Sequence, residues 1–234
     1  MQHVRDISDA HGPQVVRVSE LRRLAHGVTR EIFERPGHPD QILKVVRPEK
    51  WVAYRQKRGL WARLKHRFTL GRYKFLSKEY RSYLRSAWLA DRYGRNIPMV
   101  EFGPLIRTDQ GLAQVARKAS DGQGGLAPTL AGLRDDGSLF RPTMIDRLNA
   151  FVGDVYVTRV IASDLSTQNI VLDSGLQPAR FVLIDGFGDN ALLPLRVWFR
   201  RLNERQLDQR FARMAAALRL DWDAEARLYR LQPG

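Results

Sequence analysis

Three side chains that carry oxygen atoms lie close together in the second half of the chain. Asn169 follows Asp164 in the stretch ASDLSTQNIVLD, and Asp185 follows the apolar run at 181–184. If residues 170–172 and 181–184 pair as a hairpin, Asn169 and Asp185 lie at the same end of it. Amide and carboxylate oxygens suit Mg²⁺, which also keeps waters and binds phosphate oxygens. Asp164 is then placed to accept a proton from an attacking hydroxyl or to orient it.

A purely structural explanation of these residues also exists. An Asx-turn can close the loop after Asp164, and Asp185 can cap a turn. The Asp-x-x-x-x-Asn spacing, followed by a hairpin and IDGFG, is however the arrangement of a kinase catalytic loop and its metal-binding Asp. We therefore predict phosphoryl-transfer chemistry, with Asp164 as the base and Asn169 and Asp185 as metal ligands.

A lysine and a glutamate in the first half can complete such a site. Lys44 stands inside the apolar stretch ILKVV, where an unpaired buried ammonium is costly. Glu79, near the start of a predicted helix, is the candidate partner, and the pair would hold Lys44 against nucleotide phosphates. The alternative is that Lys44 faces solvent from an edge strand and Glu79 only favours a helix N-terminus.

A weak glycine-rich pattern precedes Lys44. In LAHGVTREIFE only the middle glycine of a nucleotide-binding loop, Gly27, is present. We expect its backbone to approach phosphate closely and Arg30 to add positive charge. A plain hairpin turn explains the same residues.

The spacing of apolar residues and the positions of turn residues predict the strands and helices that position these residues. We expect strands at 15–24, 29–34, 41–46, 99–102 and 112–116, and helices at 77–93, after Pro142, and from Leu195 onward. The apolar stripe of the 77–93 helix is predicted to be Tyr80, Leu84, Ala87 and Trp88. The core candidates of the last helix are Trp198, Leu202, Phe211, Met214 and Leu218.

These elements predict an α+β protein with two lobes. We expect a flexible N-terminus at 1–14, an antiparallel-sheet lobe at 15–118 with a basic insert at about 50–74, a hinge or linker at 119–142, and a reduced, mainly helical lobe at 143–234. A ligand is expected in the cleft between the lobes.

Charge and composition favour some classes of function and exclude others. The 234 residues carry a net charge of +14, and residues 50–74 hold nine Lys or Arg and no acid, interleaved with aromatic side chains. Such a segment favours an anionic partner, although a solvated helix surface is the plainer explanation. The chain has no Cys, which excludes disulfides, thiolate zinc sites and Cys nucleophiles. Without a leader pattern or an apolar membrane span, we expect a cytoplasmic protein, with a peripheral position at the inner membrane as the alternative.

Three stretches together resemble one known family. IASDLSTQNIVLD, FVLIDGFGDNALLPLRVWFRR and LAHGVTREIFERPGHPDQILKVVRP are similar to the PhoP regulatory network protein family of the YrbL type. The resemblance implies a kinase-like bilobal domain with ATP and Mg²⁺ in the cleft. It also implies that Lys44 contacts phosphates, that Glu79 pairs with Lys44, and that Asp164, Asn169 and Asp185 have the roles given above.

The expected activity is ATP- and Mg²⁺-dependent phosphorylation of a hydroxyl on an anionic glycan, lipid or small molecule. Where protein kinases have His and Arg before the catalytic Asp, this chain has Ala162 and Ser163, so a nucleotide-binding pseudokinase with a regulatory role is the first alternative. The second alternative is a protein that binds polyanions or a membrane surface, including lipopolysaccharide, through residues 50–74. Nucleic acid is the less favoured polyanion.

Overall fold

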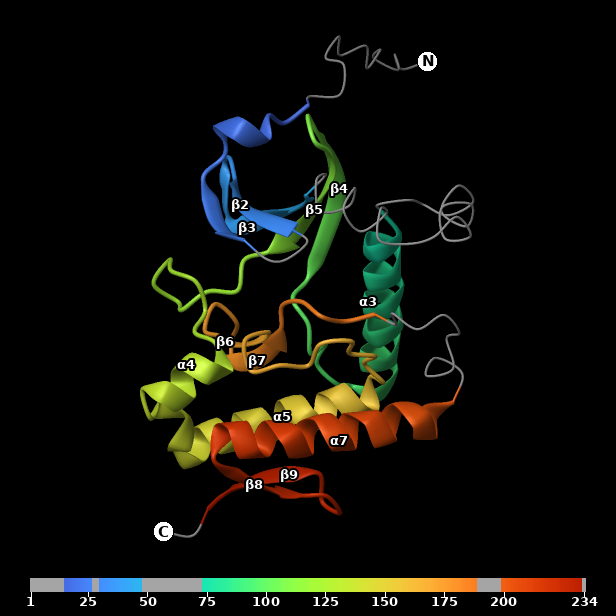
Figure 1. Cartoon of the computed structure of the whole chain (residues 1–234), viewed down its shortest axis with the longest axis vertical. Coiled ribbons are helices and arrows are strands. Elements are labelled where there is room, and N and C mark those ends of the chain that lie inside the picture. The colour runs from blue at the N-terminus through green and yellow to red at the C-terminus, as the bar shows by residue number, and fades with distance from the viewer. Residues whose placement is uncertain (1–14, 27–29, 48–72, 189–198, 233–234) are drawn as a thin grey trace, which may run out of the picture. The chain divides into compact units, whose positions relative to one another are not determined.

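The computed structural model describes residues 15–26, 30–47, 73–188 and 199–232 (Figure 1). Contacts divide the chain into two compact units, Met1–Leu64 with Gly103–Ala116, and Lys65–Phe102 with Arg117–Gly234. The predicted α+β class is confirmed, because one unit is built on a sheet and the other mainly on helices. The predicted N-terminal segment 1–14 and most of the basic insert 50–74 lie outside the described residues.

The first unit is built on a five-stranded sheet in the order β1-β2-β3-β5-β4. After the 3-10 turn Val18–Glu20, its strands are β1 Arg23–His26, β2 Arg30–Arg35, β3 His38–Val46, β4 Phe102–Thr108 and β5 Gly111–Arg117. One face of this sheet packs into an apolar core of Val18, Phe33, Leu43, Val45, Ala113 and Val115. The predicted strands at 29–34, 41–46 and 112–116 are confirmed.

Two strand predictions in this part of the chain are wrong. Residues 15–24 do not form one strand, because the Leu21 N–H turns back to the Val18 carbonyl at 3.1 Å. That turn buries Val18, whose N–H donates to Asp109 Oδ1 at 2.9 Å. The segment 99–102 contributes only an isolated bridge from Met99 to Leu183, and the strand itself begins at Phe102.

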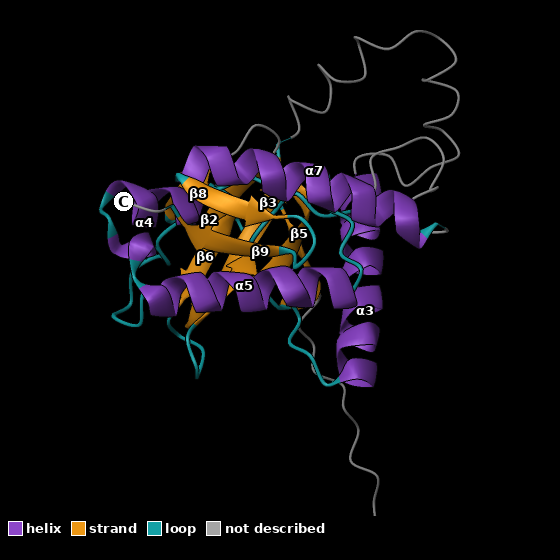
Figure 2. Ribbon diagram, turned by 90° about the horizontal axis from the view of Figure 1, so that it is seen from below, coloured by secondary structure: helices purple, strands orange, loops and turns teal. Residues whose placement is uncertain are grey.

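The second unit combines helices with two short hairpins. Its elements are α3 Lys74–Tyr93, α4 Leu130–Asp135, the 3-10 turn Ser138–Phe140, α5 Pro142–Val157, β6 Ile170–Asp173, β7 Arg180–Leu183, α7 Arg200–Leu218, β8 Leu220–Asp223 and β9 Leu228–Leu231. Pro142 begins α5, where its missing N–H leaves no helical bond unmade. Figure 2 shows α5 and α7 running alongside each other, and Figure 1 shows the β8–β9 hairpin below the two helices.

The core of the second unit extends into the segment predicted to be a linker. Leu130 and Leu133 on α4 and Leu139 just after it join the same cluster as α5, β6, β7 and α7. The observed division also differs from the predicted one in that α3 groups with the second unit. Ser86 on α3 donates to the carbonyl of Thr158, at the end of α5, at 3.3 Å.

The end of the chain differs partly from the prediction. The helix is confirmed as α7, and its Phe211, Met214 and Leu218 are buried. Leu202 is 42% exposed, so its assignment to the core is wrong. Trp198 lies outside the described residues. The β8–β9 hairpin was not predicted, and its Tyr229 is 1% exposed and packs edge-on against Phe211 at 6.2 Å between ring centroids.

The burial of α3 also departs from its predicted stripe. Leu84 is 62% exposed and Trp88 is 58% exposed. The buried positions are instead Leu76, Leu89 and Ala90, and they lie on another face of the helix. The helix ends at Gly94, whose φ of 58° gives the left-handed conformation that favours glycine.

Candidate phosphoryl-transfer site

The β6–β7 hairpin brings two of the predicted site residues together. Ile170 pairs with Leu183 in its register, and the Ile184 N–H donates to the Asn169 carbonyl at 2.9 Å. Asn169 therefore stands just before β6 and Asp185 just after β7, at the same end of the hairpin. The predicted pairing of the two runs as a hairpin is confirmed, and it leaves the two residues at the same end.

The loop that carries Asp164 is bonded to the turn that follows Asp185. The Gly186 carbonyl accepts hydrogen bonds from the Ser163 N–H at 2.7 Å, the Asp164 N–H at 2.9 Å and the Ser163 hydroxyl at 3.0 Å. The Gly188 N–H donates to the Ile161 carbonyl at 2.7 Å. The two segments that hold the candidate residues are thus one hydrogen-bonded assembly.

Gly186 has a steric role in this assembly. Its φ is +79°, and a Cβ placed there would lie 2.3 Å from the Asp164 carbonyl oxygen. No side chain fits that gap, so the close approach of the two segments depends on glycine at this position.

Asp164 and Asn169 are joined within their loop. The Asn169 Nδ2 group donates to the Asp164 carboxylate at 2.9 Å and to its backbone carbonyl at 3.2 Å. Asp164 is exposed, so an acceptor hydroxyl can reach its carboxylate. Because the amide nitrogen of Asn169 is committed to Asp164, the atom left to bind a cation is its oxygen Oδ1.

The donor set at the end of the hairpin fits Mg²⁺. Asp185 Oδ1 accepts the Gly186 N–H at 2.7 Å, which orients the carboxylate. Among the described residues no group of three or more His, Cys, Asp or Glu side chains is placed to hold a metal ion. A cation here would therefore have one carboxylate and one amide oxygen from these residues, together with water and phosphate oxygens. Mg²⁺ accepts such a set, and Zn²⁺ does not favour it.

Two residues of α7 support the loop and were not predicted. Arg210 Nη2 donates to the Ser163 carbonyl at 2.9 Å, and Asn203 Nδ2 donates to the Val160 carbonyl at 3.0 Å. Both contacts link residues more than forty positions apart, and no local pattern in the sequence indicates them.

An aromatic cluster packs against the turn after Asp185. The Phe187 ring is 3% exposed and lies 5.3 Å from the Phe102 ring, which stacks on Tyr83 at 5.1 Å. A Cβ at Gly188 would lie 3.5 Å from the backbone of Lys78, so the first turns of α3 reach this turn. Glu79, the next residue of α3, is 5% exposed.

Lys44 and Arg30 share one face of the sheet of the first unit. Successive side chains of β3 alternate between the two faces of the sheet, so Lys44 and Val46 lie on the face opposite to the core residue Leu43. Arg30 on β2 pairs with Val46 and therefore lies on the same face as Lys44. Lys44 is 3% exposed, which rules out a solvent-facing side chain, and Arg30 is 7% exposed. The pairing of Lys44 with Glu79 stays a prediction, because the two residues belong to different units. Gly27 lies outside the described residues.

Gln114 on β5 is a buried amide that the sequence did not single out. It is fully buried, and in the described part of the chain neither its Oε1 nor its Nε2 has a hydrogen-bond partner. Its neighbours Ala113 and Val115 face the apolar core, so Gln114 faces the same side of the sheet as Lys44.

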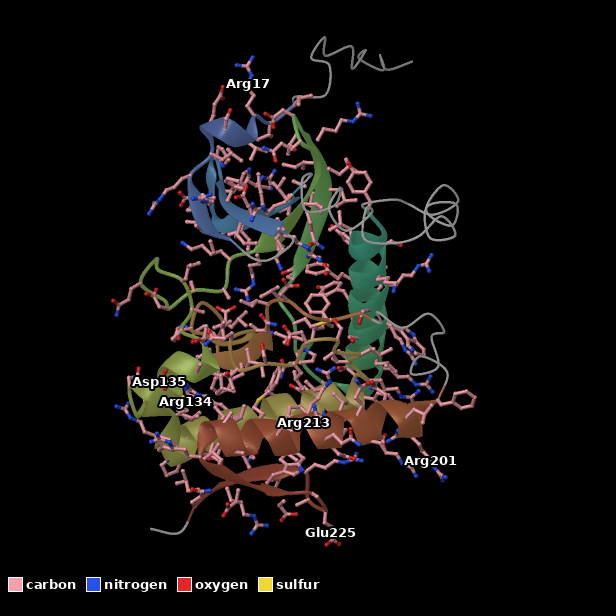
Figure 3. The ribbon with its side chains drawn as sticks, in the orientation of Figure 1. Arg17, Arg134, Asp135, Arg201, Arg213 and Glu225 are labelled. Carbon is pink, nitrogen blue, oxygen red and sulfur yellow. The ribbon has the colours of Figure 1, made fainter. Side chains whose placement is uncertain are left out.

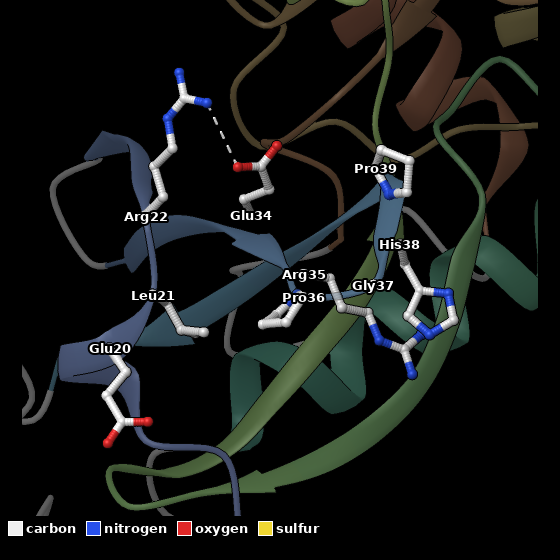
Figure 4. A pocket seen from close by; sticks show the side chains of 9 residues that line it. All are labelled: Glu20, Leu21, Arg22, Glu34, Arg35, Pro36, Gly37, His38 and Pro39. Carbon is white, nitrogen blue, oxygen red and sulfur yellow. Dashed lines mark ion pairs between the residues drawn. The ribbon is translucent and has the colours of Figure 1, made fainter.

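A surface pocket in the first unit involves none of these residues. It is lined by the turn between β2 and β3, at 35–39, and by residues that include Arg22 and Glu34 (Figure 4). Arg22 and Glu34 form an ion pair at 3.6 Å there, with the Arg22 side chain largely exposed. We assign this pocket no part in the candidate site.

The fold and the site together define a class of protein. A five-stranded sheet unit, a helical unit, and an Asp-x-x-x-x-Asn loop bonded to a turn that carries Asp185 form a kinase-like arrangement. The chain belongs to the PhoP regulatory network protein YrbL family, whose model matches residues 16–219. The family resemblance stated from the sequence is confirmed.

Comparison with other proteins adds the following. None of the curated proteins matches the sequence. Among solved structures, the chain is similar to the kinase domain of Mycobacterium tuberculosis PknI, crystallised as a mutant, with 16% identity and a TM-score of 0.42. That match covers 86% of this chain and 74% of the PknI chain. No helix among the described residues is both long enough and apolar enough to cross a membrane.

Proposed function

We propose that this protein is an ATP- and Mg²⁺-dependent phosphotransferase that phosphorylates a hydroxyl on an anionic glycan, lipid or small molecule. The observation that carries the proposal is the hydrogen-bonded assembly of Asp164, Asn169 and Asp185 at the end of the β6–β7 hairpin. Phosphoryl transfer relies on positioning and on neutralising charge, and both demand such a rigid set of oxygen ligands.

Each residue of the assembly has a distinct part in this proposal. Asn169 Oδ1 and the Asp185 carboxylate hold Mg²⁺, which neutralises the charge of the phosphates when it is bound. Asp164, exposed and fixed by Asn169, orients the acceptor hydroxyl and accepts its proton. Lys44, buried in the first unit, contacts nucleotide phosphates and pairs with Glu79. Arg30 adds positive charge near the phosphates, and the backbone of Gly27 approaches them closely.

The test is ATP turnover by the purified protein with acceptor fractions from a bacterial lysate, including lipid and glycan extracts. Asp164→Asn should abolish turnover while nucleotide binding is retained, because it removes the base and leaves the metal ligands. Asp146→Asn is the matched control, since Asp146 is an exposed carboxylate on α5. Turnover that is equal in the wild type and Asp164→Asn contradicts the proposal.

A pseudokinase is the second candidate, and one observation favours it. Ala162 and Ser163 replace the His and Arg that precede the catalytic Asp in protein kinases, and the Ser163 hydroxyl serves as an anchor to Gly186. Such a protein would bind nucleotide within its regulatory network and transfer nothing. A thermal shift with Mg²⁺-ATP that Asp185→Asn removes, without phosphoryl transfer to any acceptor fraction, would favour this candidate.

A further inference from the structure

One face of α3 exposes large apolar side chains among arginines. Leu84 and Trp88 are 62% and 58% exposed, and Tyr93 at the end of the helix is 49% exposed. Arg81 and Arg92 fall on the same face by the three- and four-residue spacing of a helix, and both are exposed. The Arg92 guanidinium lies 5.6 Å from the centre of the Trp88 ring, so the charge and the ring form one surface.

The first turns of α7 repeat this combination. Phe199 is 56% exposed and Leu202 is 42% exposed. Arg201 and Arg205 are exposed beside them, and Figure 3 shows the Arg201 side chain directed away from the ribbon. Glu204, the acid within this stretch, is already bonded by Arg200 and by Arg227 at 3.2 Å, so it does not offset the exposed arginines.

Both helices belong to the second unit, so the two patches can be considered together. In both Figure 1 and Figure 2 the N-terminal end of α7 extends to the side of that unit on which α3 lies. We call Arg81, Leu84, Trp88, Arg92, Tyr93, Phe199, Arg201, Leu202 and Arg205 the basic–aromatic surface. Within residues 81–95 the sequence has four arginines and one acid, Asp91.

We propose that the basic–aromatic surface binds the surface of a bilayer that contains anionic phospholipids. Charge complementarity selects an anionic partner, because nearly all the charge on this surface is positive. The exposed Trp, Tyr, Phe and Leu select a bilayer over a soluble polyanion. Aromatic rings lie favourably at the level of the head groups, Leu inserts among the acyl chains, and arginines reach the phosphates.

This inference goes beyond the proposed function, since it concerns residues outside the candidate site and holds whether or not the protein is an enzyme. It places the second unit on a membrane surface through a peripheral contact. Binding through these two helices should be reversible, because each inserted side chain contributes only weakly. It should also be sensitive to salt, because salt screens the attraction between the arginines and the anionic lipids.

The test is co-sedimentation of the full chain with vesicles of phosphatidylcholine, with and without phosphatidylglycerol. We expect binding only to the vesicles that contain phosphatidylglycerol, weakening as salt is added. The double variant Leu84→Ser with Trp88→Ser should partition about tenfold more weakly, since it removes the inserted side chains. The double variant Arg81→Gln with Arg92→Gln should lose about fivefold for each arginine.

Matched controls lie elsewhere on the same unit. Leu126 and Leu231 are 51% and 41% exposed, so Leu126→Ser with Leu231→Ser removes two exposed apolar side chains outside the surface. Arg141→Gln with Arg213→Gln removes two exposed charges, one just before α5 and one on α7. All the substituted side chains are exposed, and circular dichroism checks that each variant is folded.

The possible outcomes separate the proposal from its alternatives. No binding by the wild type, equal binding to both kinds of vesicle, or equal losses in the control variants each overturns it. If the arginine variant weakens binding and the Leu84 and Trp88 variant does not, the surface binds soluble polyanions, and the bilayer proposal is wrong.

Discussion

Replacing Gly186 by alanine tests whether the candidate site depends on the close approach of the loop at 161–164 to the turn at 186–188. The added Cβ would lie 2.3 Å from the Asp164 carbonyl oxygen and 2.9 Å from the Asp164 Cβ. Both are atoms of a hydrogen-bonded loop, so the overlap cannot be relieved by rotating a flexible side chain. The loop at 161–164 must separate from the turn at 186–188.

The size of the effect follows from the contacts that separation breaks. The Gly186 carbonyl accepts three hydrogen bonds, from two backbone N–H groups and the Ser163 hydroxyl. At about 0.5–1.5 kcal/mol for each net hydrogen bond, their loss lowers the free energy of unfolding by roughly 1.5–4.5 kcal/mol. Holding alanine at a φ of +79° adds about 1 kcal/mol.

Thermal denaturation followed by circular dichroism measures this loss, and Gly137→Ala is its control. Gly137 has the same φ of +79°, but nothing lies within 4 Å of a Cβ built there. The control should therefore lower the melting temperature by about 2–4 °C, and Gly186→Ala should lower it at least twice as far. Equal shifts for the two variants would refute the steric argument.

Three further substitutions test other parts of the structure. Asp173→Asn removes a fully buried carboxylate that pairs with Arg117, so it should lower stability by about 3–5 kcal/mol in thermal denaturation. Gln114→Leu should leave stability unchanged or raise it by about 1–2 kcal/mol, because both polar atoms of this amide are buried without a partner in the described structure. A lower midpoint of urea denaturation for this variant would contradict the prediction. Burial raises the pKa of Asp154, so the folded state holds this proton more tightly than the unfolded chain. The contribution of Asp154 to stability should then fall as pH rises through the raised pKa, and Asp154→Asn, assayed by urea denaturation from acid to neutral pH, should flatten that dependence.

The sequence by itself determined the hairpin that carries the site. Residues 170–172 and 181–184 are short apolar runs separated by a turn, and they pair with the register that aligns Ile170 with Leu183. Asn169 and Asp185 flank these runs, so their proximity follows from local pairing alone. The Asp164–Asn169 contact spans five residues and is likewise local.

Which face of α3 is buried was decided by tertiary packing. The helix carries apolar side chains on two faces, Leu76, Leu89 and Ala90 on one and Leu84 and Trp88 on another. A helical repeat read from the sequence cannot choose between two such stripes. The choice depends on what packs against the helix, including the bond from Ser86 to the Thr158 carbonyl at the end of α5.

The supports of the site also came only from the tertiary structure. Arg210 and Asn203 bind loop carbonyls more than forty residues away, and Gly186 is required because another segment passes within 3 Å of its missing Cβ. Such contacts depend on how distant elements meet, whereas residue type and spacing describe only what lies a few positions away. The sequence therefore determined which residues can do chemistry, and folding decided what holds them in place.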